Sequence, residues 1–303
     1  MMITLKIILF ILVSPLLSGF ISKIKNNLRM RKGQSIFQPY YNLAKLFAKE
    51  EEVVSETASW VFKVAPFIVL SSVLSVVILI PVFIFVNPLQ QMGDFLALVF
   101  IFALGRFFLS LAALDTGSSF GGMGSSREMF ISSLVEPALF MVIFAISLQF
   151  GSTNISAFSG SHIISASSII AAVALLLVVI AETSRVPVDN QETHLELTMV
   201  HEAMVLEYSG RSLALIEIAS YIKQMIFFFL IAQLIFPVGF PSGNLTQLFL
   251  WILWYFARIG IIAVIVALIE ISVAKMRLFR VADFLGFAFV LGVMATVCAI
   301  LGV

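Results

Sequence analysis

Eight apolar runs constrain this chain more than any other feature of its sequence. A helix needs about 20 predominantly apolar residues to cross about 30 Å of hydrocarbon, and 61% of the 303 residues are hydrophobic while only 12% are charged. The runs lie at residues 3–21, 64–86, 95–114, 129–150, 162–181, 213–236, 248–271 and 284–303. The sequence therefore predicts an all-α integral membrane protein with about eight transmembrane helices.

No internal repeat and no linker rich in Gly, Ser or Pro divides the chain. Residues 1–303 are therefore predicted to form a single polytopic membrane domain. The basic cluster beside the first run follows it instead of preceding it, and no small-residue cleavage site is present. We therefore expect this run to be retained as a transmembrane helix and not removed as a signal peptide.

The distribution of basic residues predicts the orientation, because Lys and Arg in short loops stay on the cytoplasmic side. The loops near residues 87–93, 151–161 and 237–244 contain no Lys or Arg, whereas the alternate loops carry most of the 18 basic residues. We therefore expect both termini outside and the protein in the inner (cytoplasmic) cell membrane. The formal net charge of +1 gives no indication of a nucleic-acid partner.

One amphipathic helix is expected after the first transmembrane helix. Apolar and aromatic residues recur at helical spacing between residues 37 and 48, with Pro39 near the start and Lys45 and Lys49 on another face. Such a helix lies at a membrane surface, here the cytoplasmic one. Two roles remain open, an anchor in lipid or a docking platform for a peripheral subunit.

Seven carboxylates lie within residues 181–217, between two segments that are otherwise typical of membrane helices. An acid at the bilayer centre costs about 2.5 to 3.5 kcal/mol, so acids at or inside a membrane boundary are functional candidates. Like charges on one helix face raise each other's pKa, and carboxylates that titrate near neutral pH can pass protons. The predicted proton-relay residues are Glu136, Glu182, Glu192, Glu196, Glu202, Glu207 and Glu217.

Each relay residue has a structural alternative. The acids of the cytoplasmic loop can form an ordinary solvated face. Glu136 and Glu217 lie within apolar runs, where pairing with a basic residue of another helix is the alternative. The available counter-charges are Arg106, Lys223 and Arg258.

The chain has too few ligands for a metal centre of its own. It contains one cysteine, Cys298, and three histidines, so neither an iron-sulfur cluster nor a structural zinc site can be assembled from it. The spacing of His194 and His201 is not HExxH, and the Gly-rich segment 115–127 lacks the phosphate-binding-loop pattern and is expected to be a flexible inter-helix loop. Uphill ion movement would therefore need a partner or a gradient. A redox-complex subunit, a secondary transporter and a passive membrane anchor remain open.

Several motifs carry a family resemblance. AETSRVPVD at 181–189, the acids Glu192 and Glu196, and EYSG at 207–210 resemble the characteristic loop of the respiratory complex I subunit 1 family, with VPVD where complex I subunits usually read APFD. Residues 29–50 and 270–286 resemble its first and last cytoplasmic loops. LDTGSSFGGMGSSREMFISSLVEPAL, at 114–139, is similar to the membrane subunits of energy-converting group 4 [NiFe] hydrogenases of the formate hydrogenlyase type.

The resemblance implies a subunit without a redox centre, embedded in an ion-translocating oxidoreductase. It implies a [NiFe] centre and iron-sulfur clusters on hydrophilic large, small and iron-sulfur partner subunits, and antiporter-like membrane subunits in the bilayer beside it. Quinone binding is an open alternative. By matching position, Asp189 joins the acids of the relay, which would couple redox chemistry to proton or sodium movement.

The implied docking and charge-partner residues for the hydrophilic arm are Arg29, Arg31, Asp115, Arg127, Arg185, Lys275, Arg277 and Arg280. A membrane subunit of a membrane-bound [NiFe] hydrogenase is the leading functional prediction. A complex I-like quinone or sulfur-compound oxidoreductase is the first alternative, and a stand-alone secondary ion transporter is the second.

Overall fold

The computed structural model describes residues 2–51, 55, 58–81, 93–158, 165–190, 199–237 and 245–302. Regular structure in this part of the chain is helical, apart from one isolated antiparallel bridge between Asp94 and Asn154. The helices are α1 (Met2–Leu28), α2 (Gln38–Ala48), α3 (Trp60–Leu79), α4 (Phe95–Asp115), α5 (Ser119–Phe150), α6 (Ile155–Phe158), α7 (Ala166–Glu182), α8 (His201–Val205), α9 (Gly210–Ile235), α10 (Leu245–Ser272) and α11 (Leu278–Leu301). The predicted all-α class is confirmed.

Within the described residues, seven helices are long and apolar enough to cross a membrane: α1, α3, α4, α5, α9, α10 and α11. The eighth predicted span, 162–181, corresponds to α7, a shorter apolar helix of 17 residues. The chain is therefore a multi-pass membrane protein. The predicted position of its termini outside the cell stays a prediction.

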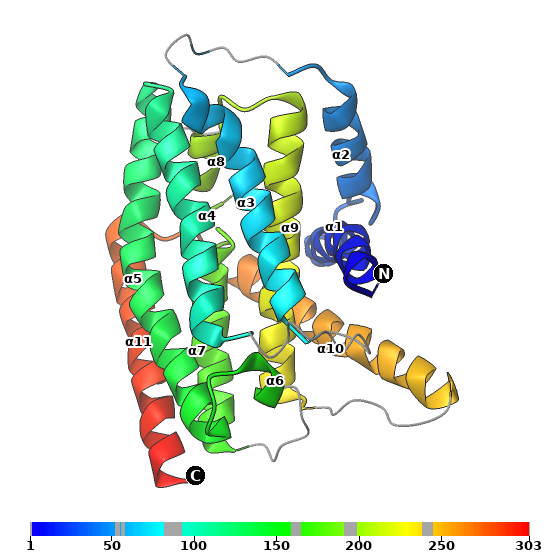
Figure 1. The fold of residues 1–303 in the computed structure, drawn as a ribbon, viewed down its shortest axis with the longest axis vertical. Helices are drawn as coiled ribbons and strands as arrows, with labels where there is room; N and C mark the ends of the chain where they lie inside the picture. Colours follow the sequence, from blue (N-terminus) through cyan, green and yellow to red (C-terminus); the bar gives the residue numbers. More distant parts are fainter. Residues whose placement is uncertain are drawn as a thin grey trace.

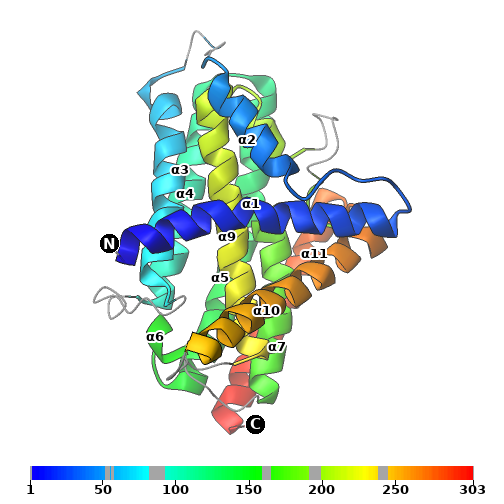
Figure 2. The same ribbon diagram turned by 90° about the vertical axis from the view of Figure 1, so that its right-hand side faces the viewer.

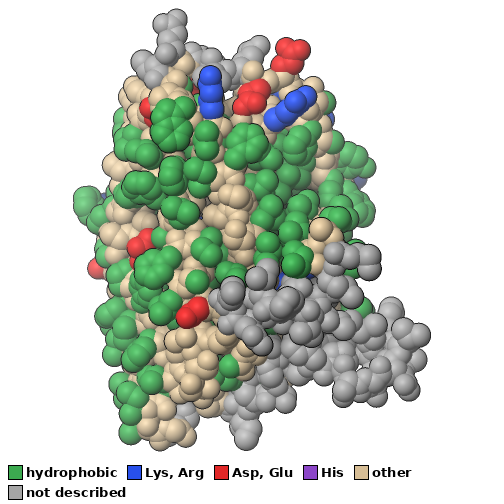
Figure 3. Space-filling model, viewed as in Figure 1, with side chains coloured by type: hydrophobic (Ala, Val, Ile, Leu, Met, Phe, Trp, Pro, Cys, Tyr) green, Lys and Arg blue, Asp and Glu red, His purple; other side chains and the backbone are tan. Residues whose placement is uncertain are grey.

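The helix α9 is the centre of the bundle (Figure 1). It packs against α1, α2, α3, α7 and α10, and its residues from Gln224 to Leu234 are all buried. A helix that is apolar around its whole circumference is stable only when neighbours cover every side. The helices α3, α4, α5, α7 and α11 form the rest of the upright bundle (Figure 1). Hydrophobic side chains are spread over the described part of the face in Figure 3.

Two helices cross α9 steeply on one side of the bundle, α1 and α10 (Figure 2). Near one end of α1, the fully buried Lys6 ammonium donates to the carbonyl oxygens of Ile78 and Ile80, where α3 ends. Near the other end, the Lys25 Nζ lies 2.7 Å from the Glu270 Oε2 of α10. Polar contacts therefore hold α1 at both ends against its neighbours.

The amphipathic helix is confirmed as α2, which begins at Gln38 with Pro39 in its first turn. Pro39 and Leu43 are buried against the bundle, where α2 packs on α9 and α1. Phe37 and Tyr41 point away from it and are more than half exposed. The helix therefore has one face on the protein and an outer face with aromatic side chains. Its position at the cytoplasmic membrane surface stays a prediction.

The prediction of a flexible loop at residues 115–127 is wrong, because α5 begins at Ser119 and the rest of this segment is helical. The Ser118 side chain caps the helix by accepting a hydrogen bond from the Gly121 N–H at 3.1 Å. A Cβ atom on Gly124 would lie 2.9 Å from the Ala203 Cβ and 3.0 Å from the Val200 carbonyl oxygen. The glycine thus permits close packing of α5 against α8 and does not provide flexibility.

We expect Gly124→Ala to lower the free energy of unfolding by about 1–3 kcal/mol, because the new methyl group overpacks the contact with α8. Gly122→Ala is the matched control, since a Cβ there meets nothing within 4 Å. It should be neutral or stabilising by up to about 1 kcal/mol through helix propensity. Thermal unfolding of both variants in mild detergent measures the difference. Equal stability of the two variants would contradict the packing assigned to Gly124.

Candidate functional site

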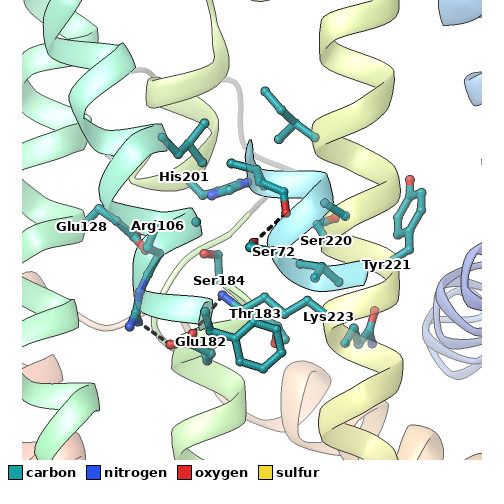
Figure 4. A pocket seen from close by; sticks show the side chains of 18 of the residues that line it. Ser72, Arg106, Glu128, Glu182, Thr183, Ser184, His201, Ser220, Tyr221 and Lys223 are labelled. Carbon is teal, nitrogen blue, oxygen red and sulfur yellow. Dashed lines mark hydrogen bonds and ion pairs between the residues drawn. The ribbon is translucent and has the colours of Figure 1, made fainter. Parts of the chain in front are cut away.

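A polar cavity lies inside the bundle among α3, α4, α5, α7, α8 and α9 (Figure 4). Its empty space is about 800 Å³, part of it open to solvent. The titratable side chains that line it include Arg106, Glu128, Glu182, Arg185, His201 and Lys223. So many ionisable groups at the depth of apolar helices mark this cavity as the candidate site.

A charge network of four residues, Arg106, Glu136, Glu182 and Lys223, joins α4, α5, α7 and α9. The Arg106 Nη1 lies 2.5 Å from the Glu182 Oε2, and its Nη2 lies 2.9 Å from the Glu136 Oε1. The Lys223 Nζ lies 2.9 Å from the Glu182 Oε1. The Glu182 side chain is 1% exposed. Two cations therefore balance two carboxylates, which is the condition under which buried charges are tolerated.

The 183–190 loop follows α7 and closes one side of the cavity. The Arg185 guanidinium donates to Glu270 of α10 at 2.5 Å and to Gln224 of α9 at 2.8 Å. The Met276 N–H donates to the Pro187 carbonyl oxygen at 2.8 Å, and the Val186–Pro187 bond is cis. The loop is thus attached to the central helix and to the end of α10.

Asp189 connects the 183–190 loop to α8. Its Oδ1 lies 2.8 Å from the Lys275 Nζ, and its Oδ2 accepts hydrogen bonds of 3.1 Å from the N–H groups of Val200 and His201. The carboxylate therefore takes the place of a helix cap at the start of α8. One buried acid fixes both α8 and the segment between α10 and α11.

The short helix α8 presents two titratable side chains to this region. Burial lowers the pKa of His201, against the opposing effect of the neighbouring Glu202, so the imidazole is mainly neutral at pH 7. Burial raises the pKa of Glu202. Since a neutral imidazole can both donate and accept a proton, His201 has the chemistry of a proton carrier at the cavity wall.

The family model described as NADH dehydrogenase matches residues 1–301. The chain belongs to this family, the family of complex I subunit 1. It is 32% identical over 277 residues to hydrogenase-4 component C of Escherichia coli (strain K12), covering 90% of this chain and 85% of that protein. It is 31% identical over 275 residues to formate hydrogenlyase subunit 4 of the same organism, covering 88% and 87%.

Two further comparisons have lower sequence identity. NADH-quinone oxidoreductase subunit 8 of Rhodothermus marinus is 27% identical over 212 residues, covering 66% of this chain and 60% of that protein. A chain in the structure of the membrane-bound sulfane sulfur reductase, an archaeal respiratory membrane complex, superposes with a TM-score of 0.80 at 17% identity and covers 98% of both chains. At that identity the last match shows the fold alone.

The structure brings some predicted relay residues of this family member together and separates others. Of these acids, Glu182 lines the cavity, and Glu136 reaches it through Arg106. Glu217 lies one helical turn from Tyr221, whose hydroxyl lies 3.5 Å from its Oε2 and whose side chain lines the cavity. Asp189, Glu202 and Glu207 also lie outside the cavity lining. Glu192 and Glu196 lie outside the described residues.

The expected counter-charges are partly as predicted. The pairing of Arg106 with Glu136 is confirmed. Lys223 pairs with Glu182, for which the sequence predicted no ion pair. The prediction for Arg258 is different from what the structure shows: its guanidinium donates to the Gln233 side chain at 3.1 Å and to the Phe236 carbonyl oxygen.

Several predicted docking residues make contacts within the chain. Arg185 and Lys275 are bound as described above, and Arg127 donates to the Met199 carbonyl oxygen at 2.9 Å. Asp115 accepts from the Ser59 N–H at 2.7 Å. The docking residues that are exposed are Arg29, Arg31, Arg277 and Arg280.

Sequence reasoning missed Glu128 and Glu270. Glu128 was hidden by the interpretation of residues 115–127 as a loop, which placed it outside a helix; the Ser118 cap was the available signal. Glu270 stands at the end of an apolar run and had no signal of its own. Among the described residues no group of three or more His, Cys, Asp or Glu could hold a metal ion.

We expect Arg106→Gln to lower the free energy of unfolding by about 3–5 kcal/mol, because it leaves two carboxylates with one counter-charge. The double variant with Glu136→Gln restores the balance of Glu182 with Lys223 and should recover part of this loss. Arg106→Lys keeps the charge without the fork that binds both carboxylates, so its loss should be smaller. Thermal unfolding in mild detergent compares the three. A loss below about 1 kcal/mol for Arg106→Gln would contradict a buried network.

Proposed function

We propose that this chain is the membrane subunit of an ion-translocating, membrane-bound [NiFe] hydrogenase complex in the cytoplasmic membrane. Its similarity to hydrogenase-4 component C and to formate hydrogenlyase subunit 4, above 30% identity over most of each chain, supports this choice within the family. The observation that carries the proposal is the charge network of Arg106, Glu136, Glu182 and Lys223. The network provides carboxylates that can gain or lose a proton, in a chain that we propose to have no redox centre.

The network is suited to respond to charge outside the chain. Inside a protein, the lower dielectric makes the interaction between two charges stronger and longer in range than it is in water. A charge change at a partner's cluster near the 183–190 loop would therefore alter the balance between Glu182 and its two cations. The response would be a proton moving between acids of the relay, from the side of His201 and Glu202 toward Glu182 and Glu136.

Glu136 supports a route out of the chain toward a neighbouring membrane subunit. Its side chain is 37% exposed and lies in a depression of the α4–α5 face with Ser132, Ser133, Phe100 and Phe107. A carboxylate at this depth is costly against lipid. We propose that an antiporter-like membrane subunit covers this face and that Glu136 passes the coupling to it.

The hydrophilic arm is proposed to dock on the exposed basic residues around the ends of α1 and α10. Arg29 and Arg31 follow α1, and Arg277 and Arg280 follow α10. The Lys25–Glu270 ion pair holds the two helix ends together. Lys275, in the segment after α10, binds Asp189, and Asp189 accepts a hydrogen bond from the His201 N–H. A subunit docked on this segment would therefore be connected to the cavity wall through these two contacts.

Cofactors belong to the partners in this proposal, with the [NiFe] centre and the iron-sulfur clusters on the hydrophilic subunits. A quinone or sulfur-compound oxidoreductase remains the alternative. The relation to NADH-quinone oxidoreductase subunit 8 favours quinone within that alternative. The charged lining of the cavity is better suited to protons than to an apolar ring.

The assembled complex provides the first test. We expect affinity purification of the tagged chain in mild detergent to recover hydrophilic subunits in stoichiometric amounts, with nickel, iron and hydrogen-evolving activity. Recovery of iron without nickel, together with bound quinone or sulfur-reducing activity, would replace the hydrogenase proposal by its alternative. A chain that purifies alone and moves ions in liposomes would be a secondary transporter.

A second prediction concerns ion coupling. Glu217→Gln should reduce ion translocation in proteoliposomes by about tenfold or more, because an amide cannot carry a proton. Hydrogen evolution by the same complex should stay within about twofold, since Glu217 lies on the coupling route and not at the redox centres. Glu50→Gln, at an exposed position, is the matched control. Unchanged ion translocation in the Glu217 variant would remove this residue from the relay.

A further inference from the structure

An apolar groove lies between α1 and α10 on the side of the bundle opposite to the polar cavity's α4–α5 wall. Figure 2 shows the two helices diverging across α9. Leu16, Leu17 and Phe20 of α1 form one wall, and Phe256 and Gly260 of α10 form the other. The empty space of the groove is about 550 Å³, part of it open to the surroundings.

The α10 wall of the groove has free space at Gly260. A Cβ atom built there would meet nothing within 4 Å. The same wall contains aromatic and aliphatic side chains only, so the occupant must be apolar along this part of its length. A flexible hydrocarbon chain satisfies that condition.

A basic residue of α1, Lys23, follows the residues that line the groove. The groove-lining residues of α1 follow helical spacing, and Lys23 comes three residues after Phe20 on the same helix face. Lys25, on a different face, binds Glu270 and holds the converging ends of α1 and α10 together. The register of α1 therefore puts Lys23 on the helix face that lines the groove, beyond Phe20.

The charge of this part of the chain is one-sided. The first 49 residues contain eight Lys and Arg and no Asp or Glu, although the whole chain has a net charge of only +1. One residue of this set, Lys25, forms the ion pair with Glu270 of α10 described above. The helix α2 beside this region turns Phe37 and Tyr41 outward. Basic clusters next to an amphipathic helix with exposed aromatic residues attract anionic lipid headgroups.

We propose that the groove between α1 and α10 binds one anionic glycerophospholipid. One acyl chain lies between Phe20 and Gly260, and the phosphate lies at Lys23. The proposal requires no redox partner and stands apart from the proposed hydrogenase function. The groove selects for an acyl chain, and the positive end selects for net negative charge, so a zwitterionic lipid satisfies only the first requirement.

Native mass spectrometry of the complex released from nanodiscs tests the site. The nanodiscs contain equal amounts of phosphatidylglycerol and phosphatidylcholine. We expect the wild type to retain phosphatidylglycerol about fivefold over phosphatidylcholine, the preference that one basic residue gives at an anionic surface. Lys23→Gln should bring the ratio close to one. Lys63→Gln, at an exposed position on α3, is the matched control and should keep the wild-type ratio.

A second variant tests the acyl-chain part. Gly260→Leu fills the groove and should remove the retained lipid of either class, whereas Gly286→Leu on α11, where a Cβ also meets nothing within 4 Å, should not. Equal retention of the two lipids by the wild type, or equal ratios in the Lys23 and Lys63 variants, would overturn the proposal. Loss of a membrane subunit instead of lipid in Gly260→Leu would overturn it too, because the groove would then hold a protein helix. If that variant does not assemble, the Lys23 comparison alone decides.

Discussion

The burial of Glu182 is the constraint on which the rest of the site depends. A carboxylate that is 1% exposed at the end of an apolar helix is stable only if fixed positive charge surrounds it. Arg106 of α4 and Lys223 of α9 provide that charge from two sides, and Arg106 also binds Glu136 of α5. Electrostatic contacts thereby join four helices, α4, α5, α7 and α9, at one level of the bundle.

A second set of contacts connects the charge network to the segment after α10. The 183–190 loop starts at the buried end of α7, and Arg185 and Asp189 attach it to Glu270 and Lys275. The same Asp189 fixes the first N–H groups of α8, which rests on α5 at Gly124. The surface after α10 and the cavity wall at His201 are therefore joined through one carboxylate. In the proposed coupling, this short path lets a partner at the surface act on the cavity without a large movement of helices.

The sequence predicted the elements better than their contacts. Length and hydropathy located the apolar helices, and helical spacing located α2, because both are local properties of the chain. The partners of Glu182 could not be read in this way, since Arg106 and Lys223 are 76 and 41 positions away and only the fold brings them together. The glycines of 115–127 misled for a related reason. The sequence does not distinguish a glycine that permits flexibility from a glycine that permits a close contact. The structure does, because Ala203 packs against Gly124.

The shortness of α7 explains why an irregular loop lines a cavity inside a membrane protein. With 17 residues it extends about 26 Å, less than the roughly 30 Å of hydrocarbon that a spanning helix must cross. The 183–190 loop consequently begins at the depth of Arg106 and Lys223. Non-helical backbone at that depth is tolerated only when its polar groups are satisfied within the protein or by a water-filled cavity.

That requirement is met in two ways. The N–H groups of Thr183 and Arg185 donate to carbonyl oxygens of α7 at 2.9 Å each, and the Asp189 N–H donates to Arg185 at 3.0 Å. The Pro187 carbonyl oxygen accepts from Met276, and the remaining space is the polar cavity itself. Continuing α7 beyond Glu182 would replace the 183–190 loop with helix, and the contacts of Arg185 and Asp189 would be lost. The early end of this one helix thus leaves space for the polar cavity beside the buried Glu182.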